Sequence, residues 1–556
     1  MSDRAVNRRT IVMGIGATAG VAAVGGLTVN AQASDTGDPK SSDSPDALVF
    51  DKDDYTVVTE TITTDDGDKE VVYHFYKPRD YVTNPSDGTH QSLVVSVPVA
   101  IDGEAVDATR APIVLANVVG AYMPSTVADA VGVGQAVMEM GDLGGGPGGG
   151  GPGGSPTPPG SGTGGPGGGA PGGGTGAING MVNLAKLAVA AGYVAVEPGT
   201  RGRSLTTSDG TYYGTAPAVI VDLKAAVRYV KFNKGRIPGD TERIISTGTS
   251  AGGAVSALLG ASGDSPIYHK YLKELGAAEA SDAVFGTGTW CPITDLEHAD
   301  GAYEWIWGGN VTQGTGEVVD QGVSRALQSR FAEYQASLKV RGLKGFGPLT
   351  ARNYDQYLLE TYLQPSATRY LAALSDSDRT AYLASNAFIT WSGGKATFTW
   401  ADYLTHVGAR KKTAPAFDAF DLSAGENNEF GAGTTESRHF TEYGLRNDTT
   451  GVTGKRLDSD IPEVLDLMNP MYHIGRHNPG RSRHWWIRVG TNDSDTSPTV
   501  SANLAAALDN LGDDVNHLYY WDQGHATNID PGDFIAWVAE ISGHRSTGHK
   551  STSRKK

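Results

Sequence analysis

Ser250 lies in the pentapeptide 248–252 (GTSAG), which matches the G-x-S-x-G pattern of a serine nucleophile. The pattern alone is a weak signal, because a chain with this glycine content should match it roughly once by chance. Its position is more informative, since it separates an expected strand at 243–247 from an expected helix at 251–259. A sharp turn there would expose the hydroxyl, and the start of the helix would favour developing negative charge. The alternative is a serine that only caps a helix in a glycine-rich turn.

A nucleophilic serine needs a base and an acid that orients the base, and in this arrangement the acid precedes the base in the chain. Asp493 and Asp495 follow an expected strand at 484–489. His525 follows an expected strand at 517–521, in a loop beside a glycine. We predict a triad with Asp493 as the acid and His525 as the base, although spacing alone does not separate Asp493 from Asp495. The alternatives are an exposed loop histidine and aspartates that cap a turn.

The oxyanion that forms during ester cleavage requires two backbone N–H donors. One donor should be the N–H of Ala251, directly after the serine. The second should come from the loop that follows the strand at 111–118. That loop has the sequence VGAY at 119–122, and its small residues allow close approach of backbone to substrate. We therefore predict that the N–H groups of Ala121 and Ala251 form the oxyanion hole.

The elements that must hold these residues alternate between strand and helix. Apolar runs predict strands at 111–118, 193–197, 243–247, 484–489 and 517–521, with another ending near residue 290. Helical spacing predicts helices at 182–191, 217–232, 251–259, 500–511 and 533–541. This alternation predicts an α/β fold, with a mostly parallel central sheet flanked by helices. The stretch 301–460 has helical patterns at 325–338 and 354–374 and predicts a largely helical lid between late core strands. Residues 47–300 and 461–543 would form the core.

Composition narrows the function classes. The chain has 556 residues and a formal net charge of −17, which argues against nucleic-acid or anionic-membrane partners. A single cysteine excludes an internal disulfide and cysteine-based metal sites, and no cofactor or metal motif is found. Residues 144–176 hold 20 of the 75 glycines and predict a disordered insert beside the oxyanion loop. That insert either gates large substrates or is neutral.

The amino terminus has the pattern of an export signal. Arg8-Arg9 precedes a mildly apolar stretch that ends near Val29, and Ala31-Gln32-Ala33 resembles a cleavage site. We expect residues 1–33 to be a twin-arginine signal peptide and the mature protein to be secreted or held in the cell envelope, with no membrane contact after cleavage. The alternative is that the signal remains as a membrane anchor. Polar segments at 34–46 and 544–556 predict a disordered tether and a disordered basic tail.

Three longer strings point to a family: PGDTERIISTGTSAGGAVSALLGASGDS, WCPITDLEHADGAYEW and RVGTNDSDTS. Together they resemble the subtype B bacterial tannases, serine esterases of the α/β-hydrolase superfamily that cleave galloyl esters. The resemblance covers about residues 47–545 and is interrupted by the glycine-rich insert. It implies that Ser250 is the nucleophile, that the first aspartate of the D-x-D pair, Asp493, is the acid, and that His525 is the base.

The same resemblance implies a pocket for the galloyl ring. Lys412, Glu426 and Asp495 would face the galloyl hydroxyls, and Ile293 would pack against the ring. Three adjacent phenol groups need such acceptors and donors, since a buried polar site left unmatched rejects analogues that lack them. Gly425 stands where the family often has proline, so the ring clamp would be looser. Without the resemblance, Lys412 and Glu426 would be interpreted as a solvated surface pair.

We therefore expect an exported serine esterase that hydrolyses galloyl esters through an acyl-enzyme, without a cofactor. Its partner would be a small phenolic ester. One alternative is a feruloyl or other carboxylesterase of the same fold. Another is a non-catalytic phenolic-binding protein on a hydrolase scaffold, which the intact order of serine, aspartate and histidine argues against. The paired-cysteine motif of fungal tannases and feruloyl esterases cannot form with one cysteine.

Overall fold

The computed structural model of the protein describes residues 28–30, 45–77, 80–139 and 182–544. The predicted glycine-rich insert (144–176) lies outside the described residues. So do most of the expected signal peptide (1–33), the tether (34–46) and the tail (544–556). The last two residues of the expected tether fall in a short 3₁₀ helix, η1 (Pro45–Leu48).

One large sheet runs through the molecule, with the strand order β1-β2-β3-β4-β9-β6-β10-β11-β16-β17, and β5 pairs with β4. Its strands are β1 (Thr28–Asn30), β2 (Thr56–Thr64), β3 (Gly67–Tyr76), β4 (Leu93–Ile101), β5 (Glu104–Ala105), β6 (Pro112–Ala116), β9 (Val194–Pro198), β10 (Asp240–Thr249), β11 (Gly286–Trp290), β16 (His484–Gly490) and β17 (Asp514–Tyr520). From β9 to β17 all neighbours pair in parallel. The predicted mostly parallel sheet is therefore confirmed. The antiparallel strands β1 to β5 at its other end were not predicted.

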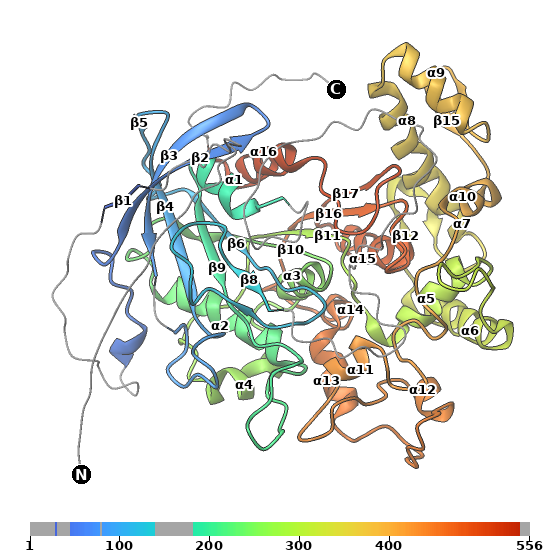
Figure 1. Ribbon diagram of the computed structural model, residues 1–556, viewed down its shortest axis with the longest axis horizontal. Helices are drawn as coiled ribbons and strands as arrows, with labels where there is room; N and C mark the ends of the chain where they lie inside the picture. The colour runs from blue at the N-terminus through green and yellow to red at the C-terminus, as the bar shows by residue number, and fades with distance from the viewer. Residues whose placement is uncertain (1–27, 31–44, 78–79, 140–181, 545–556) are drawn as a thin grey trace, which may run out of the picture.

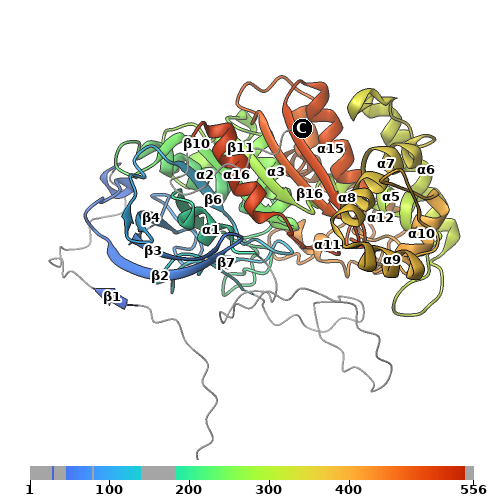
Figure 2. The same cartoon turned by 90° about the horizontal axis from the view of Figure 1, so that it is seen from above.

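Helices cover both faces of the parallel part (Figures 1 and 2). α1 contacts α16 over one face, while α2, α3, α14 and α15 pack together on the other. These helices are α1 (Leu184–Ala190), α2 (Ala218–Phe232), α3 (Ala251–Ala261), α14 (Pro470–Ile474), α15 (Pro498–Asn510) and α16 (Pro531–Ser542). η2 (Pro266–Tyr268) and α4 (His269–Glu274) continue from α3. No helix in the described part of the chain combines the length and the hydropathy needed to cross a bilayer.

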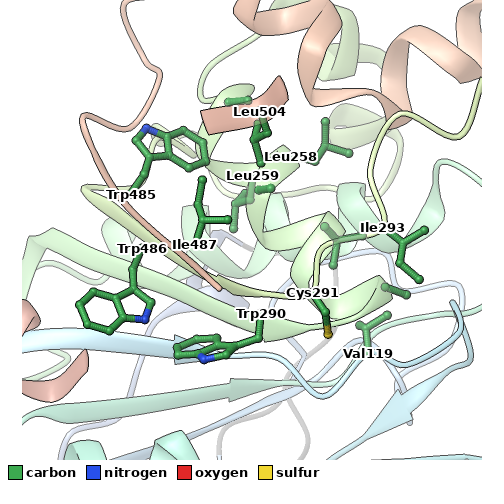
Figure 3. Close-up of a cluster of buried hydrophobic side chains, with 14 of the residues drawn as sticks. Val119, Leu258, Leu259, Trp290, Cys291, Ile293, Trp485, Trp486, Ile487 and Leu504 are labelled. Atoms are coloured by element: carbon green, nitrogen blue, oxygen red, sulfur yellow. The ribbon is translucent and has the colours of Figure 1, made fainter. Parts of the chain in front are cut away.

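Small residues let α3 lie very close to the sheet. Every residue of α3 is buried, as is all of β11. A Cβ added at Gly260 would lie 2.2 Å from Thr287 Oγ1, so only glycine allows this approach. Figure 3 shows Leu258 and Leu259 of α3 packed near Trp485 and Ile487 of β16. Because α3 and β11 share this dry core, the segments that leave them at the site are held on rigid supports.

The region between β11 and β16 is largely helical and gathers on one side of the sheet (Figures 1 and 2), as predicted for the lid. Its helices are α5 (Leu296–Trp307), α6 (Gln321–Leu338), η3 (Leu343–Gly345), α7 (Tyr354–Leu358), the π-helical turn η4 (Leu359–Leu363), α8 (Gln364–Ala373), α9 (Asp376–Ser385), α10 (Trp400–Val407), α11 (Gly425–Glu429), α12 (Glu442–Arg446) and α13 (Ile461–Met468). Short two-stranded pairs are β12 (Arg341–Gly342) with β13 (Gly347–Pro348) and β14 (Thr390–Ser392) with β15 (Lys395–Thr397); β7 (Ser125–Thr126) and β8 (Val137–Met138) pair outside this region. α5 begins before residue 301, so the boundary expected there falls inside a helix.

Candidate active site

Ser250 occupies a strained turn between β10 and α3. Its φ of 60° and ψ of −124° place a non-glycine residue in a sparsely populated conformation, which costs on the order of 1–3 kcal/mol. The surrounding backbone holds the turn, because Ser250 N donates to Trp290 O at 3.0 Å and Ser250 O accepts from Ala254 N at 2.9 Å. A Cβ on Gly248 would lie 2.2 Å from Gly252 O. The glycines that flank the serine are therefore required by close backbone approach.

His525 and Asp493 complete a chain of hydrogen bonds from Ser250. His525 Nε2 lies 2.8 Å from Ser250 Oγ, and His525 Nδ1 lies 2.9 Å from Asp493 Oδ2. Asp495 Oδ2 is farther from the same ring nitrogen, at 3.9 Å. The Asp493 side chain is only 1% exposed, and its other oxygen accepts the N–H of Asp495 at 2.9 Å. The structure thus brings Ser250, His525 and Asp493 together and gives Asp493 the shorter contact.

The groups around His525 shift the pKa of its imidazole. Burial of the imidazole lowers that pKa, but the carboxylate of Asp493 and, after it, the sulfur of Cys291 outweigh burial, so the net pKa is raised well above its usual value. Cys291 is buried beside the ring and accepts the N–H of Ala526 at 3.3 Å. Figure 3 shows Cys291 and Ile293 following Trp290 at the end of β11, near Val119.

The loop after β6 forms a tight turn beside the serine. Ala121 and Tyr122 both have positive φ, at 48° and 58°, and Met123 N donates to Gly120 O at 2.9 Å. These are the features of a type I′ turn, which normally requires glycine or asparagine at its central positions. In the described part of the chain, no hydrogen bond uses the N–H of Ala121 or that of Ala251. Neither of the two predicted oxyanion donors is used by a protein acceptor among the described residues.

Asn117 joins this loop to the serine turn. Its side-chain amide donates to Thr247 O at 2.9 Å and to Ser256 Oγ at 2.9 Å, and its oxygen accepts from Val119 N at 3.2 Å. Asn117 is buried, so these bonds are shielded from water. The sequence analysis missed this residue because it placed Asn117 inside the expected strand at 111–118, whereas β6 ends at Ala116.

The residues expected at a galloyl pocket lie next to the triad, with one unexpected partner. Lys412 Nζ lies 3.5 Å from Glu426 Oε1 and 3.7 Å from the centre of the Phe417 ring. Asp495 instead pairs with Lys411, whose Nζ lies 2.7 Å from Asp495 Oδ1. The side chains of Lys412, Glu426 and Asp495 are 17–20% exposed. Together they form a polar, half-buried surface, and Asp495 brings it nearest to the triad, with Oδ2 3.9 Å from His525 Nδ1.

Ile293, Tyr122 and Glu429 continue this surface on its apolar side. Ile293 is buried, and its carbonyl accepts from the hydroxyl of Tyr122 at 3.4 Å. Glu429 is fully buried, and neither of its carboxyl oxygens has a hydrogen-bond partner among the described residues. Burial, only partly offset by Arg203, raises the pKa of Glu429 well above its usual value and so favours its protonated form. Nothing in the local sequence distinguishes Glu429 from a surface residue.

Buried polar groups anchor the lid segment that carries these residues. Arg410 pairs with Glu304, both without exposed side-chain surface, and donates to the carbonyls of Lys412 and Thr413 at 2.8 and 2.9 Å. The carboxyl group of Asp300 accepts three backbone N–H groups, from residues 416, 417 and 418. These contacts fix the backbone from Lys412 to Asp418, the segment that carries Lys412 and Phe417.

A second buried network holds α11, the helix of Glu426. Asp418 accepts from Asn427 Nδ2 at 2.8 Å and lies 2.7 Å from His439 Nδ1. His439 also lies 3.0 Å from Asp448. Burial lowers the pKa of His439, but the two carboxylates outweigh that effect and raise it.

One group of side chains in the described residues could hold a metal ion, and it overlaps the triad. Donor atoms of Cys291, Asp493 and His525 lie within 4.8 Å of one another. Both nitrogens of His525 already face Asp493 and Ser250, so hydrogen bonding accounts for this arrangement.

Comparisons with known proteins extend over nearly the whole chain. The BD-FAE family model matches residues 167–322, which include the Ser250 turn. No curated protein matches the sequence. The tannin acyl hydrolase of Lactobacillus plantarum is similar in structure, with a TM-score of 0.70 and 32% identity over 89% of this chain and 99% of that one. The tannase of Fusobacterium nucleatum has the same TM-score, the same identity and the same coverage of both chains. A tannin acyl hydrolase in complex with ethyl gallate matches with a TM-score of 0.70 and 31% identity over the same shares.

Proposed function

Because the chain belongs to the bacterial tannases, a family of carboxylic ester hydrolases with the α/β-hydrolase fold, we propose that it hydrolyses galloyl esters through an acyl-enzyme on Ser250. The observation that carries this proposal is the hydrogen-bonded chain from Ser250 through His525 to Asp493. The N–H of Ala251, directly after the serine, and that of Ala121, in the turn after β6, have no protein acceptor among the described residues and would serve as the oxyanion donors.

The proposed reaction has two halves. Ser250 Oγ attacks the ester carbonyl while His525 Nε2 takes its proton, and the N–H groups of Ala121 and Ala251 stabilise the negative oxygen. His525 then returns the proton to the departing alcohol as the C–O bond breaks. In the second half His525 removes a proton from water, and the oxygen of that water attacks the carbonyl of the galloyl-serine ester. The bond from that carbonyl to Ser250 Oγ then breaks, His525 returns the proton to Ser250 Oγ, and gallate leaves. Asp493 keeps the imidazole in the required tautomer and stabilises its charged form.

Selection of the galloyl group would rest on the half-buried polar surface next to His525. Glu426 and Asp495 can accept hydrogen bonds from phenol hydroxyls, and Lys412 can donate one, while Ile293 supplies an apolar wall. Burial raises the pKa of Asp495, but His525 and then Lys411 and Lys412 outweigh it and lower the pKa, which favours an ionised acceptor. A methoxy group cannot donate a hydrogen bond to either carboxylate. Feruloyl esters should therefore be poor substrates.

We expect the wild-type protein to prefer methyl gallate over methyl ferulate by about 100-fold or more in kcat/KM. Asp495→Asn and Glu426→Gln should each lower kcat/KM for methyl gallate by about 10–100-fold, because a phenol loses its charged acceptor. Both variants should retain hydrolysis of p-nitrophenyl acetate, which has no phenol hydroxyls. Steady-state kinetics with the three substrates measure this. Equal rates for gallate and ferulate esters would instead favour a feruloyl or general carboxylesterase.

We further propose that the protein is exported by the twin-arginine route, from the residues at 8–9 and 31–33. Replacing both Arg8 and Arg9 with lysine should keep the precursor inside the cell, because the pathway reads the arginine pair. Fractionation and immunoblotting of the precursor and mature forms measure this outcome. Export of the lysine variant at the wild-type level would contradict the proposal.

A further inference from the structure

Arg203 lies outside the triad and the galloyl surface, yet it contacts the turn that carries one oxyanion donor. It lies in the loop that follows β9. Its backbone N–H donates to Tyr122 O at 2.9 Å, and its Nε donates to Ala121 O at 2.8 Å. One residue thus fixes two successive carbonyls, and these belong to the two residues with positive φ.

That turn needs an external restraint. Alanine and tyrosine rarely adopt a positive φ, because the Cβ atom crowds the following carbonyl. Relaxation of either residue would rotate the peptide plane on its carboxyl side and move the turn as a whole. The N–H of Ala121, which belongs to the preceding peptide plane, would move with it. Holding both carbonyls in place keeps this donor aimed at the substrate.

Arg203 also reaches the lid. Its Nη1 donates to Asn428 Oδ1 at 2.6 Å, and Asn428 lies in α11, the five-residue helix that includes Glu426. A Cβ added at Gly425 would lie 3.0 Å from Arg203 Nη2, so the glycine at the start of α11 leaves room for the guanidinium. The planar fork of arginine can serve both acceptors at once, which a lysine ammonium on a flexible stem cannot do as well.

We propose that Arg203 is a positioning residue of this esterase, which locks the strained turn bearing Ala121 and ties it to the lid helix that carries Glu426. The proposal rests on the proposed function, since it assigns Arg203 a role in placing an oxyanion donor. It adds a physical link between the part of the site that would recognise the acyl group and the part that would stabilise its transition state.

The test compares Arg203→Ala and Arg203→Lys with the wild type on methyl gallate and p-nitrophenyl acetate. We expect Arg203→Ala to lower kcat for both esters by about 100-fold, because misplacement of a catalytic group by about 1 Å costs that much. KM for methyl gallate should change by less than about threefold, since Arg203 bonds to Ala121 O, Tyr122 O and Asn428 Oδ1 and not to the side chains proposed to bind the ring. The kcat of Arg203→Lys should lie between those of the wild type and Arg203→Ala. This second variant keeps the test valid if the alanine variant folds poorly.

Two further measurements separate positioning from a general role in stability. Added methylguanidinium should restore part of the kcat of Arg203→Ala, because the contact with Ala121 O is at an exposed position. Arg446→Ala, which removes an exposed lid arginine paired with Glu442, should keep wild-type kcat and show no response to methylguanidinium.

Unchanged kcat in Arg203→Ala and Arg203→Lys, with native thermal unfolding, would overturn the inference. A loss of kcat that only follows a loss of folded protein, with no rescue, would overturn it as well. A wild-type protein without activity on methyl gallate would contradict the proposed function, which is a different outcome from active protein that tolerates loss of Arg203.

Discussion

Ser250→Ala should lower kcat for methyl gallate by about 10⁵-fold or more, the largest effect of any single substitution in this chain. The loss is this large because alanine removes the atom that forms the acyl-enzyme, and the remaining triad members cannot act without it. Discontinuous assays of gallate release over long incubations at high enzyme concentration are sensitive enough to measure the residual rate.

The folded state should tolerate this change. The Ser250 side chain contributes one hydrogen bond, to His525, and the backbone bonds to Trp290 and Ala254 remain. Thermal unfolding should therefore be close to that of the wild type. Ser329→Ala, on the exposed face of α6, is the matched control and should keep full activity. Substantial methyl gallate hydrolysis by purified Ser250→Ala would rule out this serine as the nucleophile.

Asp493→Asn should lower kcat by about 10⁴-fold while leaving the geometry of the site intact. Asparagine can donate from its amide to His525 Nδ1, which would leave the proton on Nε2, the nitrogen that must accept the proton of Ser250. The charge that stabilises the imidazolium is lost as well. Asp495→Asn is the comparison, because Asp495 lies 3.9 Å from the ring and not within hydrogen-bond distance. If Asp495→Asn is the more damaging of the two on p-nitrophenyl acetate, the acid is assigned wrongly.

The pH dependence of kcat/KM provides an independent check on this pair. The base must be neutral to accept a proton, and the pKa of His525 is raised well above its usual value by Asp493. Activity should therefore rise with pH through an apparent pKa above about 6.5, the ordinary value for histidine. Removing the carboxylate charge removes the leading cause of the increase. The acid limb of Asp493→Asn should move to lower pH.

Local patterns were sufficient to predict the parallel sheet and the strand ends at which Ser250, Asp493 and His525 lie, whereas the galloyl-pocket residues were expected only from the family resemblance. Ser250, Asp493 and His525 each follow an apolar run, and parallel strands bring their carboxyl ends to one edge of the sheet. The antiparallel strands β2 to β4 were not predicted. Exposed positions interrupt β2 and begin β3, so neither is buried along its whole length. β4 is different, because its sequence LVVSVPVAI is almost wholly buried and was a usable strand signal.

The sequence could not show which of the long polar side chains pair with one another across the fold. Spacing left Asp493 and Asp495 equivalent, and only their distances to His525 Nδ1, 2.9 and 3.9 Å, distinguish them. The pairing of Lys411 with Asp495 joins residues 84 positions apart. Arg203 reaches Ala121 across 82 positions, and its loop carries no pattern that marks it. Contacts of this kind depend on tertiary packing and have no local signature.

The central claim is that Ser250 is the nucleophile that carries the acyl group. The most direct measurement is mass spectrometry of the wild-type protein treated with a fluorophosphonate, with peptide mapping and parallel assay of methyl gallate hydrolysis. We predict one phosphonyl group per chain, located on Ser250, and loss of activity in proportion to labelling. Ser250→Ala should remain unlabelled. Full activity in protein labelled at Ser250, or complete inactivation with the label elsewhere, would contradict the account.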